Sequence, residues 1–399
     1  MIHKINDSFD YIPDYPEGSN VTSYNCNDGC IMYYITDTSK QSFLEYKATL
    51  AATDFMLYSE STIRDNYFAT YVSKEMLLHL YYTTHDRVTR IIADPNTNYC
   101  YRQKAESVIP THQTTLYQLE LDYRTVNCGM CYIIQCEDGS FFVIDSAHMN
   151  STNDHIRIYQ LLRRLTPPEK KIVIAGWFFS HAHQDHICKF MDFIEADFTD
   201  CIIEGLYYNF PSLSAPGCER LSDGDIETIR EFFALVDKHS EIPRIKLHTG
   251  QRFSIRNLDF EVLVTHEDMY PKPLTRFNDT STVLMMTVDG CRTLFLGDSN
   301  VEESTIMVAR YGAYLKSDII QVAHHGFNHS NVGIYFCAEA KVALYPTPIS
   351  NYEADRTSEA NKTVHRISEE IYVGEKGTVE LKLPYIPHSA VVYPKEING

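Results

Sequence analysis

The spacing of apolar and polar positions divides the first hundred residues into short elements. Runs rich in β-branched and aromatic residues predict strands at 30–36, 67–72, 76–84 and 87–94. Thr38 with Gln41 fits a helix capping box, and apolar residues follow at helical spacing as far as Leu50. We therefore expect residues 1–105 to form a small α+β domain, whose last part, 94–104, is a polar, turn-rich linker.

The spacing of apolar residues changes near Leu116, where strand and helix patterns begin to alternate. The runs "MCYIIQC" and "FFVID" form one predicted hairpin, and "TVLMMTV" and "CRTLFL" form another. The run "KIVIAGWFF" is apolar on both faces, which is typical of a strand in a sheet covered by helices. Helical spacing predicts helices at 154–165, 225–239 and 302–315. We expect residues 115–399 to form a second domain of mixed sheets with outer helices.

Composition narrows the possible partners. The chain has 399 residues, a formal net charge of −18 and a pI near 5.3, so binding of long nucleic acids is disfavoured and a small-molecule substrate is expected. No signal-peptide pattern or window of roughly 18 apolar residues is present, which predicts no membrane partner. The 11 cysteines are scattered, which favours free thiols and a cytoplasmic location.

The stretch "FFSHAHQDHI" carries the most informative chemistry. His181, His183, Asp185 and His186 follow the buried strand directly, and we expect all four to lie in a loop. Imidazoles and a carboxylate suit zinc and similar divalent ions. A cation would neutralise the carboxylate and give partners to nitrogens that burial would otherwise leave without any.

Three other predicted strands also end in ligand-type residues. Asp145 follows "FFVI", Asp298 follows "TLFLG", and His324 with His325 follows "IIQVA". A single carboxylate of this kind would often be a turn residue. Together with the histidine cluster, the four strand ends predict one edge of a sheet lined with metal ligands.

This order of residues resembles the metallo-β-lactamase-fold hydrolases over roughly Leu116 to Pro384. The segments "NDTSTVL", "LFLGD" and "VAHHG" are most similar to the ComEC-type branch. The resemblance implies an αββα sandwich after the small α+β domain, and two divalent ions bridged by Asp298. Zinc is the first choice, with manganese or iron as alternatives. The implied ligands are His181, His183, Asp185, His186, Asp298 and His324.

The resemblance further implies a hydrolase in which a metal-activated hydroxide attacks phosphorus or a carbonyl carbon. We assign Asp185 and His325 to catalysis, although His325 could instead only buttress His324. Asp145 is expected to orient the histidines through hydrogen bonds. Asn278 and Ser281 are expected to bind substrate oxygens, unless they are ordinary strand-start polar residues.

The expected substrate is a phosphodiester, or a small phosphorylated molecule or nucleotide. Hydrolysis of an ester, amide or lactone is the alternative reaction. A non-catalytic, metal-containing binding or sensory protein is the alternative from another class. An oxidative di-iron function is disfavoured, because that relative has Glu where this chain has His183.

Some features depart from the pattern. Many members of the superfamily have one more histidine ligand, for which His248 and His266 are candidates here. Phe327 occupies the position of the usual Ser, which weakens any serine-based substrate contact. The pair Cys128 and Cys131 could join Cys26 and Cys30 in a zinc site, but the irregular spacing favours ordinary strand cysteines.

Overall fold

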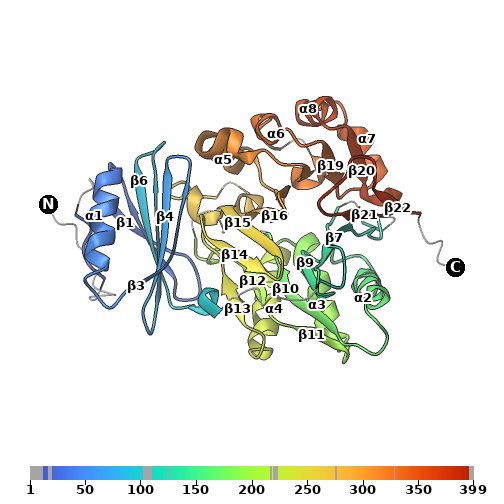
Figure 1. Ribbon diagram of the computed structural model, residues 1–399, viewed down its shortest axis with the longest axis horizontal. Coiled ribbons are helices and arrows are strands. Elements are labelled where there is room, and N and C mark those ends of the chain that lie inside the picture. Colours follow the sequence, from blue (N-terminus) through green and yellow to red (C-terminus); the bar gives the residue numbers. More distant parts are fainter. Residues whose placement is uncertain are drawn as a thin grey trace.

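The computed structural model describes residues 12–16, 20–101, 110–123, 125–126, 128–215, 218, 223–274, 276–327 and 329–394. This part of the chain forms three β-sheets with helices packed on them (Figure 1). The 6-stranded sheet belongs to the N-terminal third, and the 9-stranded and 7-stranded sheets belong to the rest.

The first sheet is antiparallel, in the order β1-β2-β6-β5-β4-β3. Its strands are β1 (Val21–Asn25), β2 (Ile31–Ile35), β3 (Met56–Ile63), β4 (Asn66–Val72), β5 (Leu77–Thr83) and β6 (Val88–Asp94). The four predicted strands are confirmed as β2, β4, β5 and β6. Helix α1 (Lys40–Leu50) covers the outer face, where Phe43, Tyr46 and Leu50 pack against the sheet (Figure 1).

The predicted capping box of α1 is wrong by one residue. Ser39 is the N-cap: its hydroxyl accepts from the backbone N of Ser42 at 3.1 Å, and its own backbone N donates to the Ser42 hydroxyl at 3.0 Å. Thr38 instead donates its hydroxyl to the carbonyl of Arg87 at 3.2 Å. A serine at the third helical position therefore completes the box that the sequence assigned to Gln41.

The segment predicted as a linker packs against the second part of the chain. It contains the short 3₁₀ helix η1 (Asn98–Tyr101), and the side-chain amides of Asn96 and Asn98 each donate to the carbonyl of Arg244 at 2.9 Å. Residues 102–104 of the expected linker lie outside the described residues. The division into domains at 1–105 and 115–399 stays a prediction.

The second sheet runs in the order β13-β12-β10-β9-β8-β7-β21-β22, and β11 also pairs with β10. From β13 to β9 neighbouring strands are parallel, and β11 is also parallel to β10. From β9 to β22 neighbouring strands are antiparallel. The strands are β7 (Thr115–Gln118), β8 (Tyr132–Gln135), β9 (Phe141–Ile144), β10 (Ile172–Phe178), β11 (Cys201–Ile203), β12 (Leu206–Tyr208), β13 (Arg244–Lys246), β21 (Thr378–Lys382) and β22 (Val391–Tyr393).

The third sheet runs in the order β14-β15-β16-β17-β18-β19-β20, antiparallel as far as β17 and parallel afterwards. Both predicted hairpins are confirmed, as β8–β9 and β16–β17. The strands are β14 (Arg252–Ile255), β15 (Leu258–Val264), β16 (Val283–Val288), β17 (Cys291–Phe295), β18 (Ile319–Gln321), β19 (Val342–Tyr345) and β20 (Glu370–Val373).

The second and third sheets face each other across an apolar core. Phe142 and Ile144 of β9 meet Phe260 of β15 and Phe295 of β17 in this layer. Alternate residues of the same strands, such as Val143, point to the helical layer on the other side. The predicted αββα sandwich preceded by a small α+β unit is therefore confirmed.

Helices cover both outer faces of the sandwich (Figure 1). The 9-stranded sheet carries α2 (Asp154–Leu165), α3 (Gln184–Glu195) and α4 (Asp223–Lys238). The 7-stranded sheet carries α5 (Val301–Tyr311), α6 (Gly333–Ala338), α7 (Ile349–Asp355) and α8 (Glu359–Ile367). In the part of the chain that the structure describes, no helix combines the length and apolar character needed to cross a bilayer. None of the 11 cysteines, all of which lie in the described residues, forms a disulfide bond.

Candidate metal centre

Four strands deliver the candidate ligands to one edge of the sandwich. Asp145 follows β9 and His181 follows β10, and these two strands are parallel. Asp298 follows β17 and His324 follows β18, which are also parallel. Because parallel strands end at the same edge of a sheet, the two sheets bring their polar strand ends together there.

The histidine motif is only partly a loop, which corrects the expectation from the sequence. His183 is the N-cap of α3, and Asp185 and His186 occupy its first turn. The apolar residues Ile187, Phe190 and Phe193 bury one face of this helix. This amphipathic pattern anchors the helix, and the helix in turn fixes the directions of the Asp185 and His186 side chains.

The structure gathers the candidate ligands into two groups that share one carboxylate. Asp185, His186, Asp298 and His325 form one group, and His181 and His183 form the other with the same Asp298. Within each group, one ligand atom from every residue lies within 4.8 Å of the others. We call these six residues the edge cluster.

The edge cluster has the features of a site that takes cations. His186 Nε2, His325 Nε2 and Asp298 Oδ1 are buried and make no hydrogen bond. His325 Nε2 lies 3.0 Å from Asp185 Oδ2 and 3.4 Å from Asp298 Oδ2. Buried polar atoms without partners are rare, and a divalent cation would bind all of these atoms. Imidazole and carboxylate donors thus fit the two ions implied by the resemblance.

Two of the histidines are held so that Nε2 faces the cluster. His186 Nδ1 donates to Asp145 Oδ2 at 2.7 Å, and His325 Nδ1 donates to the carbonyl of Pro346 at 2.9 Å. A hydrogen bond from the other ring nitrogen fixes the ring orientation and makes the ligand nitrogen more basic. Asp145 therefore lies where its orienting role was expected.

Asp145 is itself fixed from two sides. It is fully buried, and its oxygens accept from the backbone N of Ser180 at 2.7 Å and from the Ser180 hydroxyl at 2.8 Å. Ser180 was not singled out from the sequence. Its position directly before the histidine motif was the available signal.

Electrostatics divide the histidines into two kinds. Burial lowers the pKa of His181 and His183. Burial also opposes charge on His325, but the carboxylates of Asp298 and Asp185 outweigh it and raise the pKa of His325 to about 10. The same balance raises the pKa of His186 well above its ordinary value. A bound cation would replace these protons.

His324 and His325 both lie at the cluster, but in different positions. His324 Nε2 is 3.8 Å from Asp298 Oδ2, and its side chain is 16% exposed, whereas that of His325 is 1% exposed. Both residues have left-handed backbone angles, with φ of 51° and 56°, which is strained for non-glycine residues. The tight group contains His325 and not the predicted ligand His324.

The two predicted substrate-binding residues contact Asp298. Asn278 Nδ2 donates to Asp298 Oδ2 at 3.1 Å and lies 3.2 Å from His324 Nε2. Ser281 is fully buried, and its hydroxyl accepts from the backbone N of Asp298 at 3.1 Å. This geometry favours support of the Asp298 loop by Ser281. Substrate binding by either residue stays a prediction.

The two candidates for an additional histidine ligand lie elsewhere. His248 contacts Glu267 Oε1 through Nδ1 at 2.7 Å and Asp94 Oδ2 through Nε2 at 3.1 Å. His266 Nε2 lies 3.0 Å from Asn209 Oδ1. Among the described residues, neither histidine belongs to a group that contains Asp298.

The alternative of four thiolates around one zinc is not supported. Cys26 and Cys30 group with Glu267, and Cys128 and Cys131 are absent from every such group among the described residues. Cys128 instead lies beside the edge cluster, where burial and the Asp185 carboxylate raise the pKa of its thiol. This contact was not predictable, because Cys128 precedes β8 whereas Asp185 lies in the first turn of α3.

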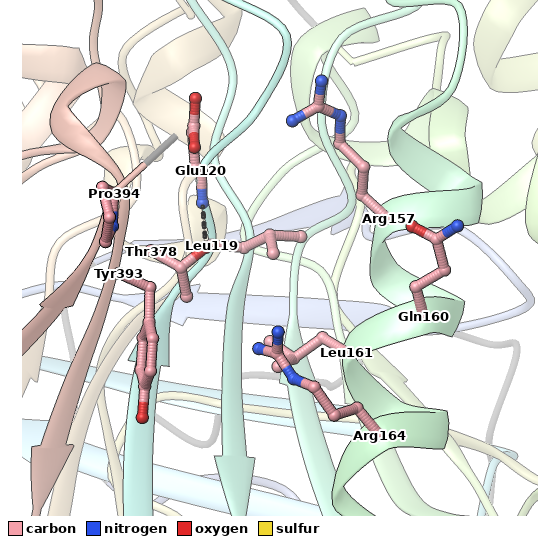
Figure 2. A pocket seen from close by; sticks show the side chains of 9 residues that line it. All are labelled: Leu119, Glu120, Arg157, Gln160, Leu161, Arg164, Thr378, Tyr393 and Pro394. Carbon is pink, nitrogen blue, oxygen red and sulfur yellow. Dashed lines mark hydrogen bonds between the residues drawn. The ribbon is translucent and has the colours of Figure 1, made fainter. Parts of the chain in front are cut away.

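A cavity of about 280 Å³ lies on the α2 side of the second sheet (Figure 2). Arg157 and Arg164 extend from α2 towards this space, and the Arg164 guanidinium carbon is 5.7 Å from the centre of the Tyr393 ring (Figure 2). None of its lining residues belongs to the edge cluster. We therefore do not place the reaction there.

No known protein family matches the sequence, and no curated protein matches it. Solved structures do match. The metallo-β-lactamase fold protein YhfI from Bacillus subtilis is 12% identical, with a TM-score of 0.40 over 66% of this chain and 97% of that one. CmlA, a diiron β-hydroxylase from Streptomyces venezuelae, is also 12% identical, with a TM-score of 0.41 over 88% of this chain and 79% of that one.

A diphosphatase from the PhnP family is 14% identical, with a TM-score of 0.36 over 65% of this chain and 94% of that one. At these identities and TM-scores the likenesses say nothing about the reaction. The chemistry of this chain must be inferred from the edge cluster.

Proposed function

We propose that the protein is a metal-dependent hydrolase with a binuclear site in the edge cluster. The observation that carries this proposal is the pair of ligand groups that share Asp298. Zinc is the preferred metal because four of the six residues are histidines, and manganese or iron are the alternatives. The proposed substrate is a phosphodiester or a small phosphorylated molecule or nucleotide. The resemblance to the ComEC-type branch and the affinity of such cations for phosphate oxygens support that class.

Two cations held there would bring the ionisation of water close to neutral pH and withdraw charge from the substrate oxygens. The chain itself supplies orientation. Asp145 and the Pro346 carbonyl aim two Nε2 atoms into the cluster. Asp298 Oδ1 lies 3.4 Å from His186 Nε2 in one group, and Oδ2 lies 3.9 Å from His181 Nε2 in the other. His325 Nε2 lies 3.0 Å from Asp185 Oδ2 and 3.4 Å from Asp298 Oδ2, where it would serve as a cation ligand. If the cations are held by the other residues, His325 keeps its proton and can donate it to the leaving group.

Access to the cluster is from the side of Asp185 and His324, whose side chains are 14% and 16% exposed. The net charge of −18 repels a long duplex, but it leaves a nucleotide-sized substrate whose charge the cations would offset.

The test combines metal analysis with turnover. Protein from cells grown with added zinc and manganese should contain about two ions per chain and should hydrolyse bis-p-nitrophenyl phosphate. The matched control is Arg164→Gln, which changes an exposed residue far from the cluster in the fold and should leave both readouts unchanged. Protein that contains no metal, or that contains metal but hydrolyses only p-nitrophenyl esters, would contradict the proposed function or its substrate class, respectively.

A further inference from the structure

A second cavity, of about 310 Å³, lies where the first sheet meets the sandwich. Its walls come from three places: the first sheet, the segment that follows β15, and helix α5. The residues that matter here are Tyr34, Asp86 and Arg90 from the first, Met269 and Pro271 from the second, and Ile306, Ala309 and Arg310 from the third. The volume is at the lower end of the roughly 300–1,000 Å³ typical of small-molecule sites.

Arg90 is the unusual group in this wall. Its side chain is 1% exposed, and its guanidinium carbon lies 5.0 Å from the centre of the Tyr34 ring and 5.4 Å from that of Tyr81. Nη2 reaches the carbonyl of Tyr270 only at 3.5 Å, and Nε and Nη1 make no hydrogen bond. A buried guanidinium with unused donors indicates a missing acceptor.

The carboxylates near Arg90 do not serve as that acceptor. Arg310 Nη1 donates to Asp268 Oδ1 at 2.6 Å, so this pair is complete. Asp86 Oδ2 lies 3.8 Å from Arg90 Nη1 and 4.0 Å from Arg310 Nη2, too far for a hydrogen bond with either. Asp86 is 35% exposed and is held by the hydroxyl of Thr83 at 2.5 Å. It is a weak counterion at the rim, able to turn outwards.

The remaining charged groups on the cavity are mixed in sign. Lys272 at the rim lies 3.4 Å from Glu302, and its side chain is 76% exposed. The rest of the lining includes the acidic Asp279 and an apolar surface formed by Met269, Pro271 and Ile306. A ligand that fills this space needs an acidic group for the arginines and an apolar body for the walls.

We propose that this cavity binds a small organic anion, with its carboxylate or phosphate group between Arg90 and Arg310 and its hydrocarbon body against α5 and the segment after β15. The acidic group takes the place of Asp86 as the partner of both guanidinium groups. The site uses no residue of the edge cluster, so it stands independently of the proposed hydrolase function.

Calorimetric titration of the protein as purified tests the proposal, and the variants described below separate binding in this cavity from binding at the edge cluster. Octanoate and mono-octyl phosphate are the two anionic probes, and octanol is the uncharged one. Saturable binding of either anion, with octanol at least about tenfold weaker, supports the site. The anion that binds more tightly shows whether the site prefers a carboxylate or a phosphate group. Equal binding of octanol, or no binding of either anion, would overturn it.

Two surface variants locate the binding. Ala309→Trp fills the cavity from an exposed position and should weaken binding by at least about tenfold. Val301→Trp puts the same side chain at a 51% exposed position of α5 that does not line the cavity, and should leave binding unchanged. If Ala309→Trp, shown to be folded by circular dichroism, bound the anion as well as Val301→Trp does, the cavity would be the wrong place.

A third variant tests the displacement of Asp86. Asp86→Asn removes the competing carboxylate but keeps an oxygen that can accept from Thr83. It should tighten anion binding by up to about fivefold, the range of a partly exposed ion pair. Weaker or unchanged binding would contradict the exchange of Asp86 for the ligand.

Discussion

Among the described residues, the edge cluster and a second buried cluster, of one histidine and two acids, differ in how completely their polar atoms are used. The edge cluster leaves His186 Nε2, His325 Nε2 and Asp298 Oδ1 without hydrogen bonds. The second, which we call the interface cluster, consists of Asp94, His248 and Glu267. There, both ring nitrogens of His248 contact carboxylate oxygens, and Glu267 also accepts from Asn209 at 2.9 Å and from Thr265 at 3.0 Å.

Cys30 lies close enough to Asp94 and His248 for the three residues to hold a metal ion, as the residues of the edge cluster do. The difference is that hydrogen bonds already use the ring nitrogens and carboxylate oxygens of the interface cluster. In the interface cluster burial opposes charge on His248, but Glu267 and Asp94 outweigh it and raise the pKa of His248 to about 10. Its charge thus balances part of the two carboxylates, and every oxygen of Asp94 and Glu267 has a donor. Similar residues therefore form a hydrogen-bonded network in one place and leave buried polar atoms without partners in the other.

The largest expected effect comes from Asp298→Asn. The change removes the charge that both ligand groups share, so turnover should fall by about 10³-fold or more, and metal content should fall with it. Elemental analysis and rates on the same preparation measure both. Full metal content with near wild-type turnover would remove the bridging role of Asp298.

His248→Gln should have the opposite effect: it should lower stability and leave metal content unchanged. It leaves two buried carboxylates without their cationic partner, so the free energy of unfolding should fall by about 3–5 kcal/mol. Metal content per folded chain should not change, because His248 belongs to no group with Asp298. Urea unfolding and elemental analysis decide this. Loss of metal from the folded variant would show that the two clusters are not separate.

Asp145→Asn should reduce turnover, but by less than Asp298→Asn does. The amide can no longer accept as strongly from His186 and Ser180, so turnover should fall by about 10–100-fold while the metals stay bound. Comparison of kcat with metal content tests this. A change in metal content as large as that of Asp298→Asn would make Asp145 a ligand in its own right.

The smallest effect concerns pH. Because the pKa of His248 is raised from 6.5 to about 10 in the folded protein, its contribution to stability is complete below pH 6.5 and is lost as the pH rises towards 10. The wild-type melting temperature should therefore decline across this interval by more than that of His248→Gln. Parallel curves for the two proteins would exclude a charged His248.

The fold and the place where most residues of the edge cluster meet were largely predictable, because strand ends carry their signal locally. The hairpins, α2 and the position of Asp298 follow from short apolar patterns. The first turn of α3 was missed because its ligand residues interrupt the apolar spacing that reveals a helix. The choice between His324 and His325 depends on two consecutive left-handed residues, which no spacing encodes.

The interface cluster was not predictable at all. Asp94 and His248 are 154 residues apart, and each is unremarkable in its own segment. Their pairing depends on how the first sheet docks on the sandwich. Polar contacts between residues so far apart produce no periodic pattern in the sequence. The residues of the edge cluster, in contrast, share a motif and a set of strand ends.

The hydrogen bonds between the first sheet and the sandwich have a consequence for cooperativity. His79 Nε2 lies 2.8 Å from the carbonyl of Thr249, Tyr81 donates to Asp268 at 2.9 Å, and Asn66 donates to the carbonyl of Arg310 at 3.2 Å. All of these hydrogen bonds are buried. Separation of the first sheet from the sandwich would therefore leave polar groups on both surfaces without their partners. The N-terminal sheet is thus tied to the melting of the sandwich, and heat should unfold the chain in a single calorimetric transition.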